Sequence, residues 1–177
     1  MTIKTFTNIG NQLESLLSEL TYPVIIENTD EVTEDNNADN VNEEDETEET
    51  ETSIPVFKNV LLVLPETDFR GFQFPLAVCY VKGGEYDDTF GIRNMPKYLK
   101  SVIGVVVTGD TRSRYEKITE IMDLIQTQFH DNDDWIKLNG TVRRTFIEDS
   151  ALTIMPTGND LASVAIFTLK HHVFKIE

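Results

Sequence analysis

Residues 74–86 read FPLAVCYVKGGEY, an almost unbroken apolar run that ends at a pair of glycines. Two more apolar runs, at residues 56–64 and 102–107, are similarly rich in β-branched residues. Runs of this composition and length are typical of β-strands, so we expect strands at residues 56–64, 76–81 and 102–107. Because the apolar residues do not alternate with polar ones, we expect a sheet that is covered on both faces, by helices on one side and by neighbouring subunits on the other.

Two amphipathic helices are expected before and after these strands. The first has Thr7 or Asn8 as its N-cap, ends at Tyr22-Pro23, and has an apolar face that consists of Ile9, Leu13, Leu16, Leu17 and Leu20. In the second, Ser113 and Glu116 match a capping box, and the helix continues to His130. Its apolar face consists of Ile118, Ile121, Met122, Ile125 and Phe129.

Further strands are expected at residues 141–148, 152–155 and 162–176. Helices and strands then follow one another in the order helix, strands, helix, strands. That order predicts an α+β fold, a mostly antiparallel sheet covered by two helices. With 177 residues, the chain is expected to form one domain, residues 1–177.

The negative charge of the chain is concentrated in one segment. The net charge is −16, but residues 27–51 hold 13 acidic side chains and no lysine or arginine, which leaves −3 for the rest. This segment has almost no apolar residues, so we expect a disordered acidic insertion at about residues 27–53. It is either a solvated spacer or an arm that repels DNA or contacts a basic partner. Fifteen scattered basic residues do not form a nucleic-acid footprint, so we expect no specific DNA binding.

The sequence offers little for catalysis, so we expect no enzyme, cofactor or metal site. His171 and His172 are neighbours on a predicted strand and therefore point to opposite faces, one packed and one solvated. Asp131, Asp133 and Asp134 lack the glycine and glutamate that a calcium loop requires. Cys79 is the only cysteine and lies in an apolar run, where a buried inert thiol is expected. No apolar stretch reaches the length of a membrane span, and the N-terminus lacks the pattern of a signal peptide.

A long connection at residues 83–100 is the best candidate for a loop that contacts a partner, because connections of this length are often functional. Exposed apolar and arginine side chains carry most of the energy of protein interfaces. The predicted anchors in this loop are Phe90, Ile92, Arg93 and Met95.

The run at residues 74–86 also resembles the tail terminator family of long-tailed phages, the minor tail or tail completion proteins. In that family a Phe-Pro pair opens an apolar strand that leads into a Gly-x-Glu-Tyr type of turn. The resemblance extends to the order of elements over residues 1–26 and 57–177, and the acidic insertion and the longer loop at residues 85–100 depart from it. It implies a virion protein, made in the host cytoplasm, that forms a six-fold ring at the head-proximal end of the tail.

The same resemblance implies that the ring stops growth of the tail tube and provides the surface for head joining. Its partners would be other copies of the chain, the tail tube protein and head-side neck or connector proteins, with DNA passing through and no membrane involved. Two alternatives remain open: a head-side connector, such as a stopper or head completion protein, and a small module that binds a host factor through the acidic arm.

Charged residues at the two ends of the second helix are candidates for the contact between ring subunits. Arg112, Arg114 and Lys117 lie at its start, where cations oppose the helix dipole. We expect Arg112, Arg114 and Lys117 to be free to face an acidic neighbour. That neighbour is predicted to be the cluster at the end of the same helix in the next subunit, formed by Asp131, Asp133 and Asp134.

Overall fold

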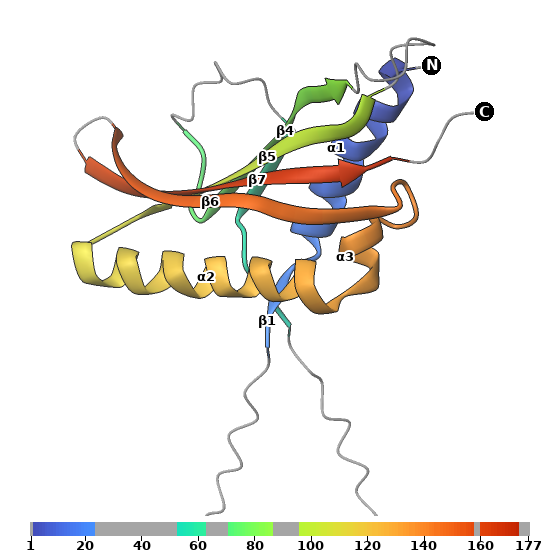
Figure 1. Ribbon diagram of the computed structural model, residues 1–177. Coiled ribbons are helices and arrows are strands. Elements are labelled where there is room, and N and C mark those ends of the chain that lie inside the picture. The colour runs from blue at the N-terminus through green and yellow to red at the C-terminus, as the bar shows by residue number, and fades with distance from the viewer. Residues whose placement is uncertain (1, 24–52, 63–70, 87–95, 158–159, 174–177) are drawn as a thin grey trace, which may run out of the picture.

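The computed structural model describes residues 2–23, 53–62, 71–86, 96–157 and 160–173. The chain has an α+β fold with a mostly antiparallel five-stranded sheet (Figure 1). The helices are α1 (Thr2–Ser18), α2 (Thr111–Asp131) and α3 (Asp133–Lys137). The strands are β1 (Thr21–Tyr22), β2 (Ile54–Pro55), β3 (Asn59–Leu62), β4 (Leu76–Tyr86), β5 (Pro96–Thr108), β6 (Arg144–Thr157) and β7 (Asp160–His172).

The strands of the main sheet lie in the order β3, β4, β5, β7, β6. Only β3 and β4 are parallel, and the other three neighbouring pairs are antiparallel. The short strands β1 and β2 pair with each other separately. The predicted fold class is therefore confirmed, and β6 is the last strand of the sheet.

One large apolar core joins α1 and α2 to one face of the sheet. The two predicted apolar helix faces enter it, and all their members are buried except Met122, which is partly exposed. Alternate residues of the central strands meet the helices from the sheet, among them Cys79, Ile103 and Phe167. The expectation that two helices cover one face of the sheet is thus confirmed.

A second apolar cluster covers part of the opposite face. Its buried members are Leu76, Val78, Val106, Ala162 and Val164. Phe72 and Phe74, from the segment before β4, pack against it. Some of the cover that we expected from neighbouring subunits therefore comes from the chain itself.

Several element bounds differ from the sequence predictions. α1 begins at Thr2 rather than at residues 7–8, and the N-cap of α2 is Asp110, so the expected capping box at Ser113 and Glu116 is wrong. Both ends of the expected loop at residues 83–100 are strand, because β4 continues to Tyr86 and β5 begins at Pro96; residues 87–95 lie outside the described residues.

The last part of the sheet also differs. β6 is a single strand of 14 residues where two short strands were expected, and β7 ends at His172. A β-bulge between Ile147 and Asp149 explains the first difference, since it interrupts the alternation of side chains without ending the strand. The acidic insertion expected at about residues 27–53 lies, apart from Ser53, outside the described residues.

Candidate partner interface

The open edge of β6 is the most distinctive surface of the described chain. β6 pairs with β7 on one side and, within the described residues, has no strand on the other. The backbone N–H and C=O groups of such an edge are available to a strand from another chain. At the other end of the sheet, β3 is only four residues long, so β6 offers much the longer edge.

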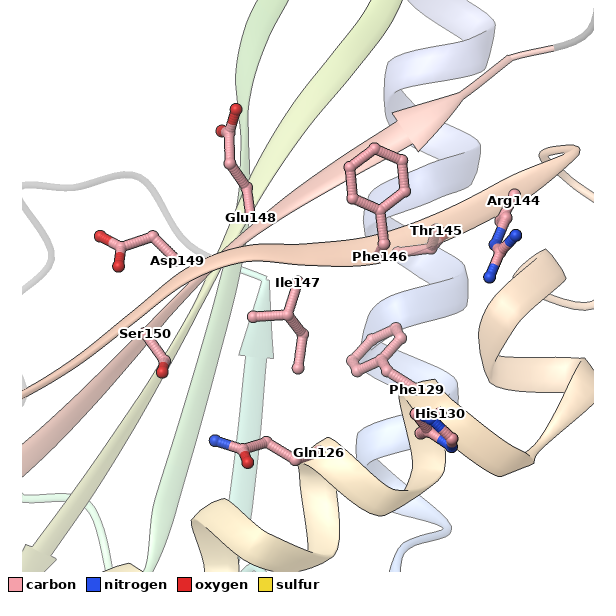
Figure 2. A pocket seen from close by; sticks show the side chains of 10 residues that line it. All are labelled: Gln126, Phe129, His130, Arg144, Thr145, Phe146, Ile147, Glu148, Asp149 and Ser150. Atoms are coloured by element: carbon pink, nitrogen blue, oxygen red, sulfur yellow. The ribbon is translucent and has the colours of Figure 1, made fainter.

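A groove of about 720 Å³ lies between this edge and the second half of α2 (Figure 2). Its lining residues are Gln126, Phe129 and His130 from α2, and Arg144, Thr145, Phe146, Ile147, Glu148, Asp149 and Ser150 from β6. Figure 2 shows Ile147 pointing toward α2, while Phe146 and Glu148 point to the other side of the strand.

The groove combines an apolar interior with charged margins. Phe129 is buried and packs edge-on against Trp135, and Ile147 is half-buried against the main core. Arg144, Asp149 and His130 are exposed along the margin. An apolar centre with a polar rim is typical of a surface that contacts another protein.

On the far side of β6, an aromatic and basic cluster fixes the strand to its neighbours. Phe146 lies edge-on to Tyr98 at 6.5 Å between ring centroids, and Lys170 Nζ lies 4.4 Å from the Tyr98 centroid. The Glu148 carboxylate forms ion pairs with Lys100, at 2.8 Å between Nζ and Oε2, and with Lys170, at 3.6 Å between Nζ and Oε1. These contacts hold the bulged part of β6 in place and leave its edge uncovered.

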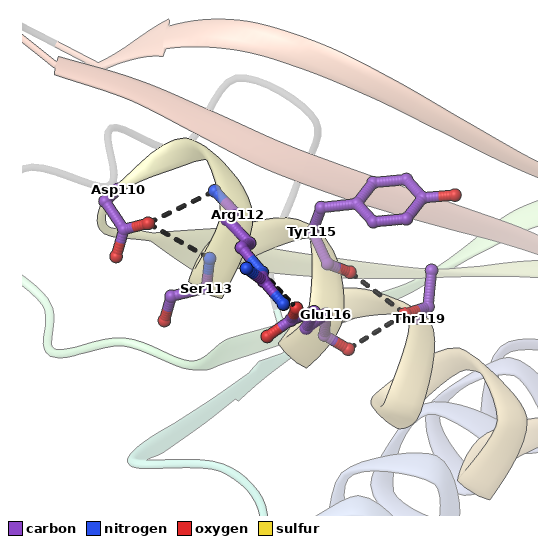
Figure 3. Close-up of polar contacts among 6 residues, drawn as sticks. All are labelled: Asp110, Arg112, Ser113, Tyr115, Glu116 and Thr119. Carbon is purple, nitrogen blue, oxygen red and sulfur yellow. Dashed lines mark hydrogen bonds and ion pairs between the residues drawn. The ribbon is translucent and has the colours of Figure 1, made fainter.

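The start of α2 departs from the predicted arrangement. Asp110 caps the helix by accepting hydrogen bonds from the backbone N–H groups of Arg112 and Ser113, both at 3.1 Å (Figure 3). Arg112 is exposed but pairs with Glu116 of the same helix at 2.8 Å. Its positive charge is therefore already compensated within the chain.

Arg114 is not free to face a neighbour, so the expectation for this residue is wrong. It is 4% exposed, and its Nε donates to Ser163 Oγ at 2.9 Å. Its Nη1 donates to the carbonyl oxygens of Leu161 at 2.8 Å and Gly109 at 3.2 Å. The side chain thus joins the start of α2 to β7, a tertiary contact that a local helix pattern does not reveal.

The acidic residues at the other end of α2 are exposed, as an interface role requires. Asp131 ends α2 and contacts His130, while Asp133 and Asp134 form the first turn of α3. Lys137 pairs with Asp133 at 2.6 Å. At 1.5 Å per residue, Arg112 and Asp131 lie about 29 Å apart along the helix, so they can meet only between different subunits.

The predicted loop anchors Phe90, Ile92, Arg93 and Met95 lie outside the described residues. Their role therefore stays a prediction. The structure does place the ends of the loop, since Tyr86 of β4 pairs with Pro96 of β5. The loop leaves the sheet at the end where Tyr98 and His172 are paired.

His171 is buried between two hydroxyl groups, as expected for one histidine of the pair. Its Nε2 lies 2.6 Å from Ser101 Oγ and its Nδ1 lies 2.9 Å from Thr145 Oγ1. Burial lowers the pKa of His171 to about 4, which keeps the imidazole neutral. The other histidine of the pair, His172, is half-buried and packs 5.4 Å from the Tyr98 ring, so neither of the two is fully solvated.

The arrangement around His171 superficially resembles a catalytic serine and histidine. However, Ser101 is fully buried, and a threonine stands where a carboxylate would stabilise an imidazolium. Cys79 is also fully buried, and burial raises the pKa of its thiol to about 12. These groups therefore act in packing and hydrogen bonding, and the groove remains the candidate site.

The groove itself was not predicted from the sequence. The open edge beside it has one local signal, the uncharged stretch at residues 150–155 that follows Glu148 and Asp149. No helix within the described residues is long and apolar enough to span a membrane. Comparison with models of known families finds none that matches the chain, and no curated protein is significantly similar to it.

Proposed function

We propose that the chain is a structural subunit of a phage particle, a tail terminator that forms a ring at the head-proximal end of the tail tube. The observation that carries the proposal is the groove between the second half of α2 and the inner half of β6, with its apolar centre and charged margins. A surface of this kind supports contact with other protein chains rather than chemistry on a small molecule. That the chain forms a ring and that it belongs to a phage are inferred from the resemblance of residues 74–86 to the tail terminator family.

A ring requires two different contact surfaces on each subunit, one for each neighbour. The groove between α2 and β6 is one such surface, and it lies toward the end of α2 that carries Asp131. The second surface is the opposite end of α2, at Arg112. In the ring, Arg112 of one subunit then lies near Asp131 of the next subunit. Since Arg112 already pairs with Glu116, this charge contact contributes specificity more than affinity.

The predicted loop anchors belong to the same proposal as contacts to the tail tube. The anchors belong to the segment that connects β4 to β5, and β5 also carries Tyr98. Replacing Phe90, Ile92, Arg93 and Met95 together by alanine should then leave the chain folded and weaken its binding to tubes. If that variant binds tail tubes as well as the wild-type chain does, the tube contact is made by another surface.

The groove is tested with purified protein and preassembled tail tubes. A double variant, Gln126→Arg with His130→Arg, places two bulky cations at exposed groove positions of α2, outside β6, and leaves the core intact. Thr127→Arg is the matched control, because Thr127 is exposed on the same helix but does not line the groove. Binding is measured by co-sedimentation with tubes, and rings are counted in negative-stain images.

The proposal predicts that the wild-type chain and Thr127→Arg form rings on tube ends and that the double variant does not. Loss of rings in both variants would show that arginine on α2 is harmful in itself. Full assembly by the double variant would exclude the groove as a ring contact. Failure of the wild-type chain to bind tubes at all would contradict the tail terminator function.

A further inference from the structure

The outer half of β6 carries an uncharged stretch, residues 150–155, with the sequence SALTIM. We call it the neutral edge run. All six of its residues are exposed, and Ile154 and Met155 are 61% and 49% exposed. Large apolar side chains are seldom left this open on an unpaired strand of a monomer.

The neutral edge run is open on both faces of the sheet. Leu152 and Ile154 pair in register with Ala165 and Ser163, which face α2. Thr153 and Met155 pair with Val164 and Ala162, which belong to the cluster on the opposite face. A partner strand placed at this edge would therefore cover apolar side chains above and below the sheet.

The inner half of β6 is protected against such pairing, and the outer half is not. The bulge between Ile147 and Asp149 distorts the edge, and Glu148 and Asp149 add charge there. Both features are common devices against edge pairing. They stop at Asp149, and the next such feature is Pro156. The open edge is thus limited to a defined segment, as expected of a specific contact.

We propose that the neutral edge run pairs antiparallel with the same run of a second copy of this chain, about a two-fold axis at Thr153. In this register Leu152 lies opposite Ile154 of the second copy, and Ala151 lies opposite Met155. Directly opposite residues share a face in an antiparallel pair, so apolar side chains meet on both faces.

The distribution of charge along β6 favours a second copy in this orientation. Asp149 lies opposite Thr157 of the other copy, and the two Asp149 residues are at opposite ends of the paired segment. A parallel arrangement would instead place Asp149 against Asp149, which is unfavourable. The other end strand of the sheet, β3, has only four residues and cannot match the length of this edge. The contact is therefore made by the same surface in both copies.

This inference is independent of the proposed ring. The two-fold contact covers residues 149–157 and shares only Asp149 and Ser150 with the groove, whose other lining residues lie outside it. It can form with purified protein in the absence of tail tubes. Its failure would leave the tail terminator proposal standing, and failure of tube binding would leave the dimer standing.

Disulfide trapping tests the register directly. Residues directly opposite each other in an antiparallel pair have Cα atoms about 4.5–5.5 Å apart, within the range that a disulfide bridges. We expect Thr153→Cys to form a reducible dimer under mild oxidation. Thr127→Cys is the matched control, an exposed threonine on α2, and should remain largely uncrosslinked. Cys79 is fully buried and should not contribute.

Sedimentation of the untrapped chain provides the second measurement. We expect a dimer that dissociates on dilution, and Thr153→Lys should weaken it at least about tenfold, because two ammonium groups would then meet at the axis. Thr127→Lys should not change it. Since Thr153 is exposed, both variants should retain the wild-type thermal unfolding curve at a dilution at which the wild-type chain is monomeric. A chain that stays monomeric at every concentration, equal crosslinking of the two cysteine variants, or an open-ended aggregate would overturn the proposal.

Discussion

Acidification should destabilise the chain through His171 by a predictable amount. The pKa of His171 is lowered from 6.5 to about 4, because burial removes the hydration of an imidazolium and only two hydroxyl groups replace it. The unfolded chain therefore takes up a proton at higher pH than the folded chain. The stability due to this group is fully present above pH 6.5 and is lost as the pH falls toward 4.

The size of the effect follows from the difference in pKa. The lowered pKa corresponds to a loss of about 3 kcal/mol of unfolding free energy in the limit of low pH, of which about 2 kcal/mol is lost between pH 7.5 and pH 5. Many carboxylates also titrate in this range, so the pH dependence of the wild-type chain alone does not isolate His171.

The assay therefore compares the wild-type chain with His171→Gln by urea unfolding at a series of pH values. The variant is less stable at pH 7.5, since it loses the hydrogen bonds to Ser101 and Thr145. Its deficit should shrink by about 2 kcal/mol by pH 5, because only the wild-type chain has a histidine to protonate on unfolding. A deficit that is constant from pH 7.5 to pH 5 would refute the assignment of His171 as a buried neutral group.

Two further predictions concern stability and are also measured by urea unfolding. Arg114→Met should lower the free energy of unfolding by about 2–4 kcal/mol, because three oxygen acceptors lose a charged donor. Arg112→Met should lower it little, since Arg112 is exposed, and equal effects would contradict the burial of Arg114. Ile125→Ala should lower the free energy of unfolding by about 2–5 kcal/mol, and Met122→Ala should lower it clearly less, because Ile125 is fully buried and Met122 only partly. The reverse order would mean that α2 is rotated about its axis.

The fold class and the helix faces were predictable because they depend on local periodicity. The apolar positions of α2 recur every three to four residues. Ile118, Ile121, Ile125 and Phe129 are indeed buried in the core that α2 shares with the sheet. The strand at residues 76–81 was also predicted, since a short continuous apolar run rich in β-branched residues is typical of a buried strand. The extension of β4 through Gly83 and Gly84 was not, because glycine pairs usually indicate a turn.

The candidate site was largely unpredictable for the opposite reason. Whether β6 has an open edge depends on the order of strands in the sheet, which a single strand does not encode. The bulge at Ile147 and Asp149 also made β6 look like two strands. Arg114 was assigned to the surface because its acceptors, Leu161 and Ser163, lie about 50 residues away and are reached only in the folded chain.

The ring at the end of the tail tube is tested most directly by adding the purified chain to growing tail tubes and imaging the products. The tail terminator account predicts that elongation stops and that averaged end views of the tubes reveal a six-fold ring made of this chain. Tubes that continue to grow at the wild-type rate, or a chain found only as a twelve-fold ring bound to the head side, would contradict it.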